Sequence, residues 1–242
     1  MAQAWQLDVS SDDVSIEPSL DLPIAATSPR AVVLVLHGGK AKSYGRVEPG
    51  QLAVKRMLPF ARSIEQSDDS LAVARLRYRY RGWNDPAADP VVDVAFALER
   101  LEESYGSVPV VLVGHSLGGR AALHTAGHPM VTGVVALAPW LPGTEPVEQL
   151  AGRDLAVLHG TRDATTSPGA SARYAARAVD VAQQVACLRV PRSGHGMLLR
   201  ARLWHALTTE FVRAIVDRES FDRPVASAIA AGCRDCRPGA SR

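Results

Sequence analysis

Ser116 is the residue of this sequence whose flanking residues best fit a nucleophile. It lies in the segment Gly114-His115-Ser116-Leu117-Gly118, directly after the apolar run at residues 110–113. A G-x-S-x-G segment at a tight turn from strand to helix needs glycine at both flanking positions and holds the serine hydroxyl clear of the backbone. The pattern predicts a nucleophilic serine. The alternative, a serine that only caps a buried helix, stays open at this point.

Two further residues have types that could activate this serine. Asp163 follows the apolar segment at residues 155–160. His195 follows another apolar segment, at residues 185–190. A serine hydroxyl is a poor nucleophile until a neighbouring base takes its proton, and a carboxylate can hold that base in the correct tautomer. We therefore expect His195 to be the base and Asp163 its partner.

Both assignments have plainer alternatives. Any single histidine can be a surface or core residue with no chemical role, and Asp163 could form an ion pair with Arg162 or Arg173. Asp154 is set aside as the acid, because it stands at the start of its predicted strand. It would therefore lie at the edge of the sheet opposite to Ser116.

Apolar strand patterns alternate with helical patterns along the chain. Parallel strands in such a sequence bring their carboxyl ends to one edge of a sheet, so the residues that follow the strands should meet there. Two short opening strands are also expected, at residues 5–7 and 14–16. The remaining predicted strands cover residues 31–36, 71–77, 110–113, 134–137, 155–160 and 185–190, and the principal predicted helices cover residues 51–66, 91–105 and 201–216.

The chain resembles the α/β-hydrolase superfamily over residues 5–218. The resemblance rests on the serine motif, on His37-Gly38-Gly39, on His159-Gly160-Thr161-Arg162-Asp163, and on the order serine, aspartate, histidine. It is strongest to small lidless serine hydrolases of the esterase and dienelactone-hydrolase type. It implies a single-domain α/β fold with a mostly parallel central sheet of about eight strands, helices on both faces and a minimal cap or none.

The domain is expected to cover residues 1–222, and residues 223–242 are expected to form a flexible tail because they are rich in alanine, arginine and proline. Between the strand ending near residue 138 and the one at residue 155 there is room for a loop or one short helix. A lid domain does not fit there.

The resemblance also implies an oxyanion hole. One donor is the backbone N–H of Leu117, and the second comes from Gly38 or Gly39, with Gly39 preferred. Three other residues are candidates to line a substrate pocket: Trp83, Trp140 and His115. For Trp83, a role in covering the core is an equal alternative.

These residues together predict a serine hydrolase that cleaves a small carboxylic ester or thioester through an acyl-enzyme. An amidase or peptidase with the same residues, and a non-catalytic binding protein on the same fold, remain alternatives. No cofactor is expected. His124 and His128 lack the glutamate and third ligand of a zinc motif, so no metal site is predicted, and the lysines near Gly39 lack the spacing of a phosphate loop.

Composition limits the partners. The chain has 242 residues, and its net charge of +2 makes no case for nucleic acid as a partner. Its apolar runs reach only about six residues, against roughly 20 for a membrane span, and its first residues have no signal-peptide pattern. Cys187 is expected to be an inert buried thiol, and no role is assigned to Cys233 and Cys236. Unpaired cysteines favour a cytoplasmic location. The oligomeric state is not determined by the sequence.

Overall fold

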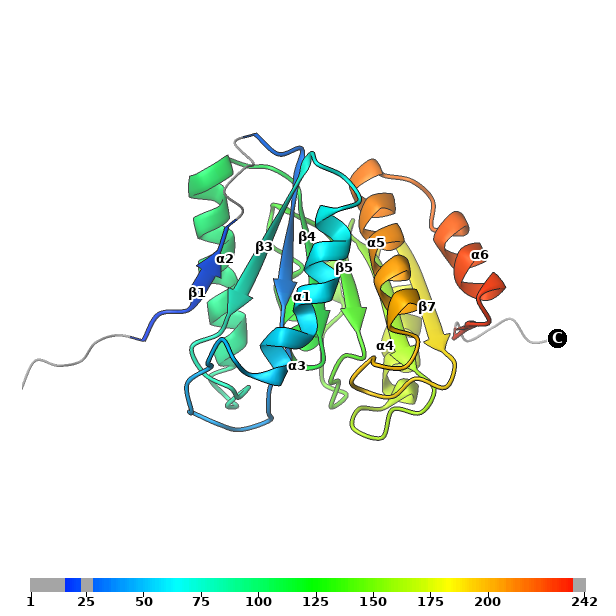
Figure 1. Cartoon of the computed structure of the whole chain (residues 1–242), viewed down its shortest axis with the longest axis horizontal. Helices are drawn as coiled ribbons and strands as arrows, with labels where there is room; N and C mark the ends of the chain where they lie inside the picture. The colour runs from blue at the N-terminus through cyan, green and yellow to red at the C-terminus, as the bar shows by residue number, and fades with distance from the viewer. Residues whose placement is uncertain (1–15, 23–27, 237–242) are drawn as a thin grey trace, which may run out of the picture.

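A mixed sheet forms the centre of the computed structural model, which describes residues 16–22 and 28–236 (Figure 1). The described strands have the order β1-β3-β2-β4-β5-β6-β7-β8. β2 to β7 run parallel, while β1 and β8 are antiparallel at the two edges. The strands are β1 (Ser19–Asp21), β2 (Ala31–Leu36), β3 (Leu71–Arg77), β4 (Val110–His115), β5 (Val131–Leu137), β6 (Asp154–Gly160), β7 (Gln184–Val190) and β8 (Arg234–Asp235).

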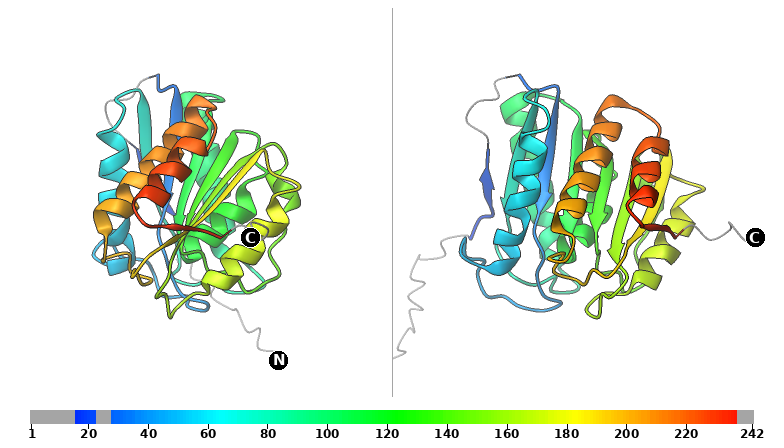
Figure 2. Two further views of the ribbon diagram at one scale, coloured as in Figure 1. Left: turned by 90° about the vertical axis from the view of Figure 1, so that its right-hand side faces the viewer. Right: turned by 45° about the vertical axis from the view of Figure 1, so that its right-hand side comes forward.

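Helices cover both faces of the sheet, as Figure 2 shows from the side. One face carries α1 (Leu52–Glu65), α5 (Ala201–Asp217) and α6 (Asp222–Ala230). The other carries α2 (Asp89–Tyr105), α3 (Leu117–Thr125) and α4 (Pro168–Ala178). The connection between β5 and β6 contains only the short 3-10 helix η1 (Glu148–Leu150), so the fold has no inserted lid. The expected fold class is confirmed.

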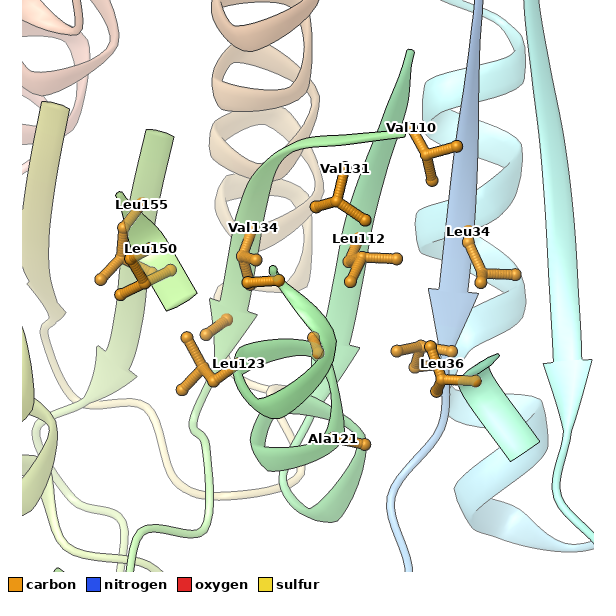
Figure 3. Packing of buried hydrophobic residues seen from close by; sticks show 14 of the residues in the cluster. Leu34, Leu36, Val110, Leu112, Ala121, Leu123, Val131, Val134, Leu150 and Leu155 are labelled. Carbon is orange, nitrogen blue, oxygen red and sulfur yellow. The ribbon is translucent and has the colours of Figure 1, made fainter. Parts of the chain in front are cut away.

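The central strands form because their sequences are mostly apolar. All six residues of β2 are buried, and so are all six of β4. Successive side chains of a strand point to opposite faces, so Leu34 and Leu36 pack with α2 and α3 while Val33 and Val35 pack with α1 and α5. Figure 3 shows the first of these cores. Burial on both faces is typical of parallel sheets between helical layers.

The end of the chain differs from the expected flexible tail. Residues 222–230 form α6, whose Ala228 is buried, and β8 pairs antiparallel with β7. The tail prediction was wrong for residues 223–236, because small apolar side chains spaced along α6 pack on the sheet face beside α5. The rest of the predicted tail, residues 237–242, lies outside the described residues.

Other predictions differ in smaller ways. The predicted strand at residues 5–7 and most of the one at 14–16 also lie outside the described residues, and the described edge strand is β1. α4 has no counterpart among the principal predicted helices. None of the helices in residues 16–22 and 28–236 is long and apolar enough to cross a membrane.

A disulfide joins Cys187 of β7 to Cys236, with 5.2 Å between the Cα atoms. The prediction of an inert Cys187 thiol was therefore wrong. The backbone N–H of Cys236 donates to the carbonyl of Cys187 over 2.9 Å, which holds the end of the described chain beside β7. Cys233 is a buried free thiol. Because disulfides are rare in reducing compartments, the sequence argument for a cytoplasmic location no longer holds.

Candidate active site

Ser116 stands at the turn from β4 to α3. Its φ of 55° and ψ of −114° are sterically unfavourable for a residue with a side chain and are held by the surrounding turn. A Cβ at Gly114 would come 2.3 Å from the carbonyl oxygen of Gly118, and a Cβ at Gly118 would come 2.6 Å from that of His37. Both glycines of the motif are thus required by close backbone contacts.

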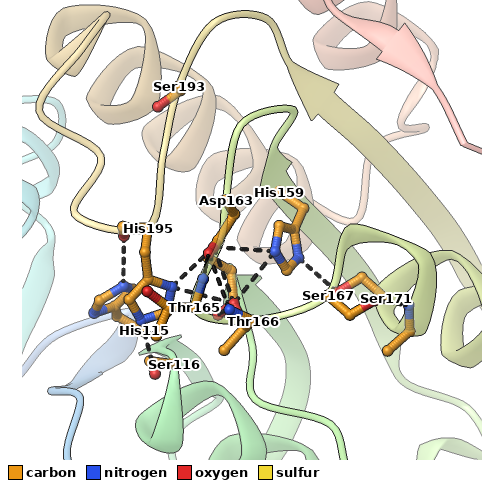
Figure 4. Close-up of polar contacts among 12 residues, drawn as sticks. His115, Ser116, His159, Asp163, Thr165, Thr166, Ser167, Ser171, Ser193 and His195 are labelled. Atoms are coloured by element: carbon orange, nitrogen blue, oxygen red, sulfur yellow. Dashed lines mark hydrogen bonds and ion pairs between the residues drawn. The ribbon is translucent and has the colours of Figure 1, made fainter.

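His195 lies in the loop between β7 and α5, and its ring reaches both other candidates (Figure 4). Its Nε2 is 3.1 Å from Ser116 Oγ, and its Nδ1 is 2.8 Å from Asp163 Oδ2. The side chain is 20% exposed. His195 therefore joins the other two residues that the sequence selected from distant segments.

Ser193 fixes the loop that carries His195. Its hydroxyl accepts a hydrogen bond of 2.8 Å from Trp204 Nε1 and donates to the carbonyl of Leu199 over 3.2 Å. Gly160, at the end of β6, lies so close that a Cβ there would come 2.2 Å from the Ser193 carbonyl oxygen. These contacts bring the histidine loop against the loop that carries Asp163.

Asp163 has a fully buried side chain whose partners keep it ionised. Its Oδ1 accepts the backbone N–H groups of Thr165 and Thr166 over 2.8 and 2.9 Å. Burial alone would raise the pKa of this carboxyl, but the hydrogen bonds from Thr166, His195 and Thr165 outweigh it and the pKa lies below its usual value.

Two histidine rings, those of His195 and His159, contact Asp163 Oδ2 at 2.8 and 3.1 Å. An ion pair with Arg162 or Arg173, the plainer alternative for Asp163, is not found among the described residues. The carboxylate is therefore available to orient an imidazole.

The loop Gly38-Gly39 lies directly against the serine turn. A Cβ at Gly38 would come 3.4 Å from Ser116 Cβ, and a Cβ at Gly39 would come 3.0 Å from Leu117 Cδ1. Leu117 is the first residue of α3, where backbone N–H groups have no partner within the helix. Gly38 and Gly39 thus lie next to Ser116 and Leu117, and the use of their backbone N–H groups as oxyanion donors stays a prediction.

His115 lies beneath the histidine loop and not on an open wall. It is 6% exposed, its Nε2–H donates to the His195 carbonyl over 3.0 Å, and the two rings are 4.8 Å apart. Burial, together with neighbouring His195, lowers the pKa of His115 to about 3, so the ring is neutral near pH 7. It can support the backbone of His195.

The two tryptophans flank a buried cation that sequence reasoning missed. Trp83 is 1% exposed and belongs to the core, while Trp140 is partly buried. The guanidinium of Arg120 lies 3.9 Å from the Trp83 ring centre and 4.7 Å from that of Trp140, and its Nε is 3.0 Å from Glu145 Oε1. The core alternative for Trp83 is therefore the one observed. An arginine within the apolar pattern of α3 was the signal that could have revealed the pair.

Sequence reasoning also assigned no role to His159 and Thr166. Both contact Asp163 Oδ2, at 3.1 and 2.9 Å. His159 belongs to the same H-G-x-x-D segment as the aspartate, and this spacing was its only signal. In the part of the chain that the structure describes, no three His, Cys, Asp or Glu side chains gather to form a metal site.

Comparison with known proteins gives one family. Residues 32–235 match the alpha/beta hydrolase family. No curated protein sequence matches closely enough to count as a relative. A lidless serine hydrolase from Xanthomonas campestris has a similar structure, with a TM-score of 0.60, 18% identity, and coverage of 81% of this chain and 87% of that chain.

Two further solved structures are similar. Est1E from Butyrivibrio proteoclasticus has a TM-score of 0.61 and 11% identity, covering 83% of this chain and 94% of its own. The esterase domain of a Rhodothermus marinus protein has a TM-score of 0.55 and 20% identity, covering 82% of this chain and 91% of its own. At such low identity the likeness establishes the fold alone.

Proposed function

The chain belongs to the alpha/beta hydrolase family, and on this basis we propose that it is a serine hydrolase that cleaves carboxylic esters through an acyl-enzyme. The observation that carries the proposal is the line of contacts from Ser116 through His195 to Asp163. Each distance is within the range for a nucleophile, its base and the group that orients the base.

In the first half of the reaction, His195 Nε2 takes the proton of Ser116 while Oγ attacks the ester carbonyl carbon. The resulting oxyanion receives hydrogen bonds from the backbone N–H groups of Leu117 and Gly39. Asp163 holds Nδ1–H of His195 and stabilises the imidazolium. The alcohol then leaves with the proton from His195.

In the second half, a water molecule gives its proton to His195 and attacks the acyl carbon. The second tetrahedral intermediate breaks down to the carboxylic acid, and Ser116 Oγ regains its proton. These steps need only the side chains named and the two backbone donors.

Esters are the proposed substrates because an alkoxide leaves more readily than an amine and needs less help from the acid form of His195. One similar structure is described as Est1E with bound ferulic acid, and another as an esterase domain. The short β5–β6 connection, with η1 as its helix, supports a small, openly accessible substrate. Thioesters can be cleaved by the same steps, whereas amides are harder to cleave because the amine is a poorer leaving group.

Labelling with a fluorophosphonate tests whether the serine is activated. We expect one adduct, located on Ser116 by peptide mass analysis and lost in Ser116→Ala and His195→Ala. His205→Ala is the matched control, since this partly buried histidine of α5 contacts Phe60 away from the proposed reacting atoms, and its labelling should equal that of the unchanged protein.

A folded protein that fails to label at Ser116 would contradict the proposal and favour a ligand-binding protein on this fold. For a protein that labels, an ester, a thioester and an anilide with the same acyl group decide the bond type. Turnover of the anilide at a rate near that of the ester would favour an amidase or peptidase.

A further inference from the structure

Asp163 lies between two imidazole rings, only one of which faces Ser116 (Figure 4). On the other side is His159 of β6, whose Nε2 is 3.1 Å from Asp163 Oδ2. The side chain of His159 is fully buried, so no solvent separates it from the carboxylate. The mechanism above makes no use of this second histidine.

The tautomer of His159 follows from its other contact. Its Nδ1 is 2.8 Å from the hydroxyl of Ser171 in α4. Within residues 16–22 and 28–236, this hydroxyl makes no other hydrogen bond, so its proton is satisfied only by donation to Nδ1. The proton of the neutral ring then resides on Nε2 and is donated to Asp163.

The environment of His159 keeps the ring neutral. Burial lowers its pKa to about 4, although the negative charge of Asp163 acts in the opposite direction. Near pH 7 the ring thus carries a single proton. His159 therefore adds a hydrogen bond to the carboxylate without adding a positive charge.

His195 shares Asp163 Oδ2 with two other groups. His159 Nε2 lies 3.1 Å and Thr166 Oγ1 lies 2.9 Å from this oxygen, while His195 Nδ1 lies 2.8 Å from it. Each additional donor takes up part of the negative charge and restricts rotation of the carboxylate. The charge available to the imidazolium of His195 is thereby reduced.

We propose that His159 is a positioning residue of the hydrolase: its Nε2–H holds the Asp163 carboxylate in place and sets the pH range in which His195 acts as a base. The proposal rests on the proposed function. His159 does not touch Ser116 and acts on His195 through Asp163, while a longer contact of 3.3 Å joins its Nε2 to the Thr166 hydroxyl, which also lies 3.1 Å from His195 Nδ1.

The other titratable groups near His195 come from separate elements. His115 of β4 packs against the His195 ring and is neutral. The positive charge of Arg56, in α1, contributes to the lowered pKa of His115. Asp163 follows β6. Substitution of His159 leaves these groups in place, so a shift in the pH dependence can be assigned to the lost hydrogen bond.

Two amides distinguish the proposed contact from simple packing. In His159→Gln the side-chain amide reaches the position of Nε2 and can donate to Asp163. In His159→Asn the amide reaches only the position of Nδ1 and can contact Ser171. His205→Gln is the control for replacing a partly buried histidine elsewhere.

The measurement is the rate of fluorophosphonate labelling of Ser116 from pH 5 to 9, with circular dichroism at each pH. For His159→Asn we expect slower labelling and an acidic limb that moves up by roughly 0.5 to 1 pH unit, the size of one net hydrogen bond. The shift is upward because the imidazolium of His195 gains the charge that His159 no longer shares. His159→Gln and His205→Gln should follow the unchanged protein.

An unchanged pH profile in folded His159→Asn would overturn the inference while leaving the proposed function intact, and so would equal shifts in the asparagine and glutamine variants. If the asparagine variant does not fold, His159→Leu combined with Ser171→Ala removes both polar groups and should show the same upward shift. If the unchanged protein does not label at all, the proposed function fails and the inference fails with it.

Discussion

His195 Nδ1 lies 2.8 Å from Asp163 Oδ2, although the two residues belong to loops that follow different strands. Because the carboxylate accepts the Nδ1–H, the unprotonated Nε2 of the neutral ring faces Ser116 Oγ at 3.1 Å. An amide in place of the carboxylate would present a donor to His195 and favour the wrong tautomer. Replacing the Asp163 carboxylate by an amide should therefore lower kcat strongly.

We therefore expect Asp163→Asn to keep its fold and to lose about 10⁴-fold in kcat, as removal of such a carboxylate does in other serine hydrolases. Steady-state kinetics on an ester, with circular dichroism, measure this. Asp154→Asn is the control, because Asp154 is a buried carboxyl at the other end of β6 and should not affect kcat. Full turnover in Asp163→Asn would exclude Asp163 as the acid.

The Gly38-Gly39 loop gives a second prediction. A Cβ at Gly39 would come 2.4 Å from the carbonyl oxygen of Arg81, so Gly39→Ala must displace the loop from Leu117. Loss of one oxyanion donor lowers kcat about 10²–10³-fold, which is the expected size here. A Cβ at Gly50, farther along the same connection, would meet nothing within 4 Å. Gly50→Ala should thus have unchanged kcat, and equal effects of the two changes would argue against the loop's role.

Stability should fall as the pH is lowered from about 6.5 to about 4. Burial lowers the pKa of His37 to about 4, of His115 to about 3 and of His159 to about 4, whereas in the unfolded chain each is near 6.5. The unfolded state therefore takes up these protons first. Each such histidine contributes a slope of about 1.4 kcal/mol per pH unit in this window.

Burial also lowers the pKa of His124 and His205, which adds to this loss, and it raises the pKa of Asp93 and Asp154, which opposes it. The histidines outnumber the aspartates, so the net direction holds. Urea unfolding at pH 7, 6 and 5 measures it. His37→Asn, whose amide can replace the donor to the Gly38 carbonyl, should have a shallower slope, and a stability independent of pH would contradict the burial of neutral histidines.

The disulfide gives the last prediction. Cys187 and Cys236 are 49 residues apart, and closing a loop of this length stabilises the folded state by about 4 kcal/mol through the unfolded chain. Cys236→Ser, or reduction, should lower the free energy of unfolding by an amount of this order. Cys233→Ser is the matched control, since this thiol is free. Thiol titration of the denatured, unreduced protein should find one free thiol, and three would mean that the bond is absent.

Much of the central fold could be predicted from the sequence. The sequence predicts residues 31–36 with the bounds of β2, because a parallel strand buried on both faces leaves a continuous apolar run. It also predicts residues 71–77 with the bounds of β3, although Arg75 and Arg77 interrupt the apolar pattern there. The grouping of Ser116, Asp163 and His195 followed from one rule of topology, that parallel strands end at a common edge. Their assignment to catalysis is a proposal that labelling will test.

The sequence by itself thus determined the parallel sheet, the serine turn and which loops meet, since these depend on local patterns and on chain direction. Only the tertiary structure decided the partners of Cys187, the burial of Trp83 and the contact of His159 with Asp163. Each of these depends on the separation of side chains from different elements, within a few ångströms. Sequence patterns specify which element a residue belongs to, and packing then fixes those distances.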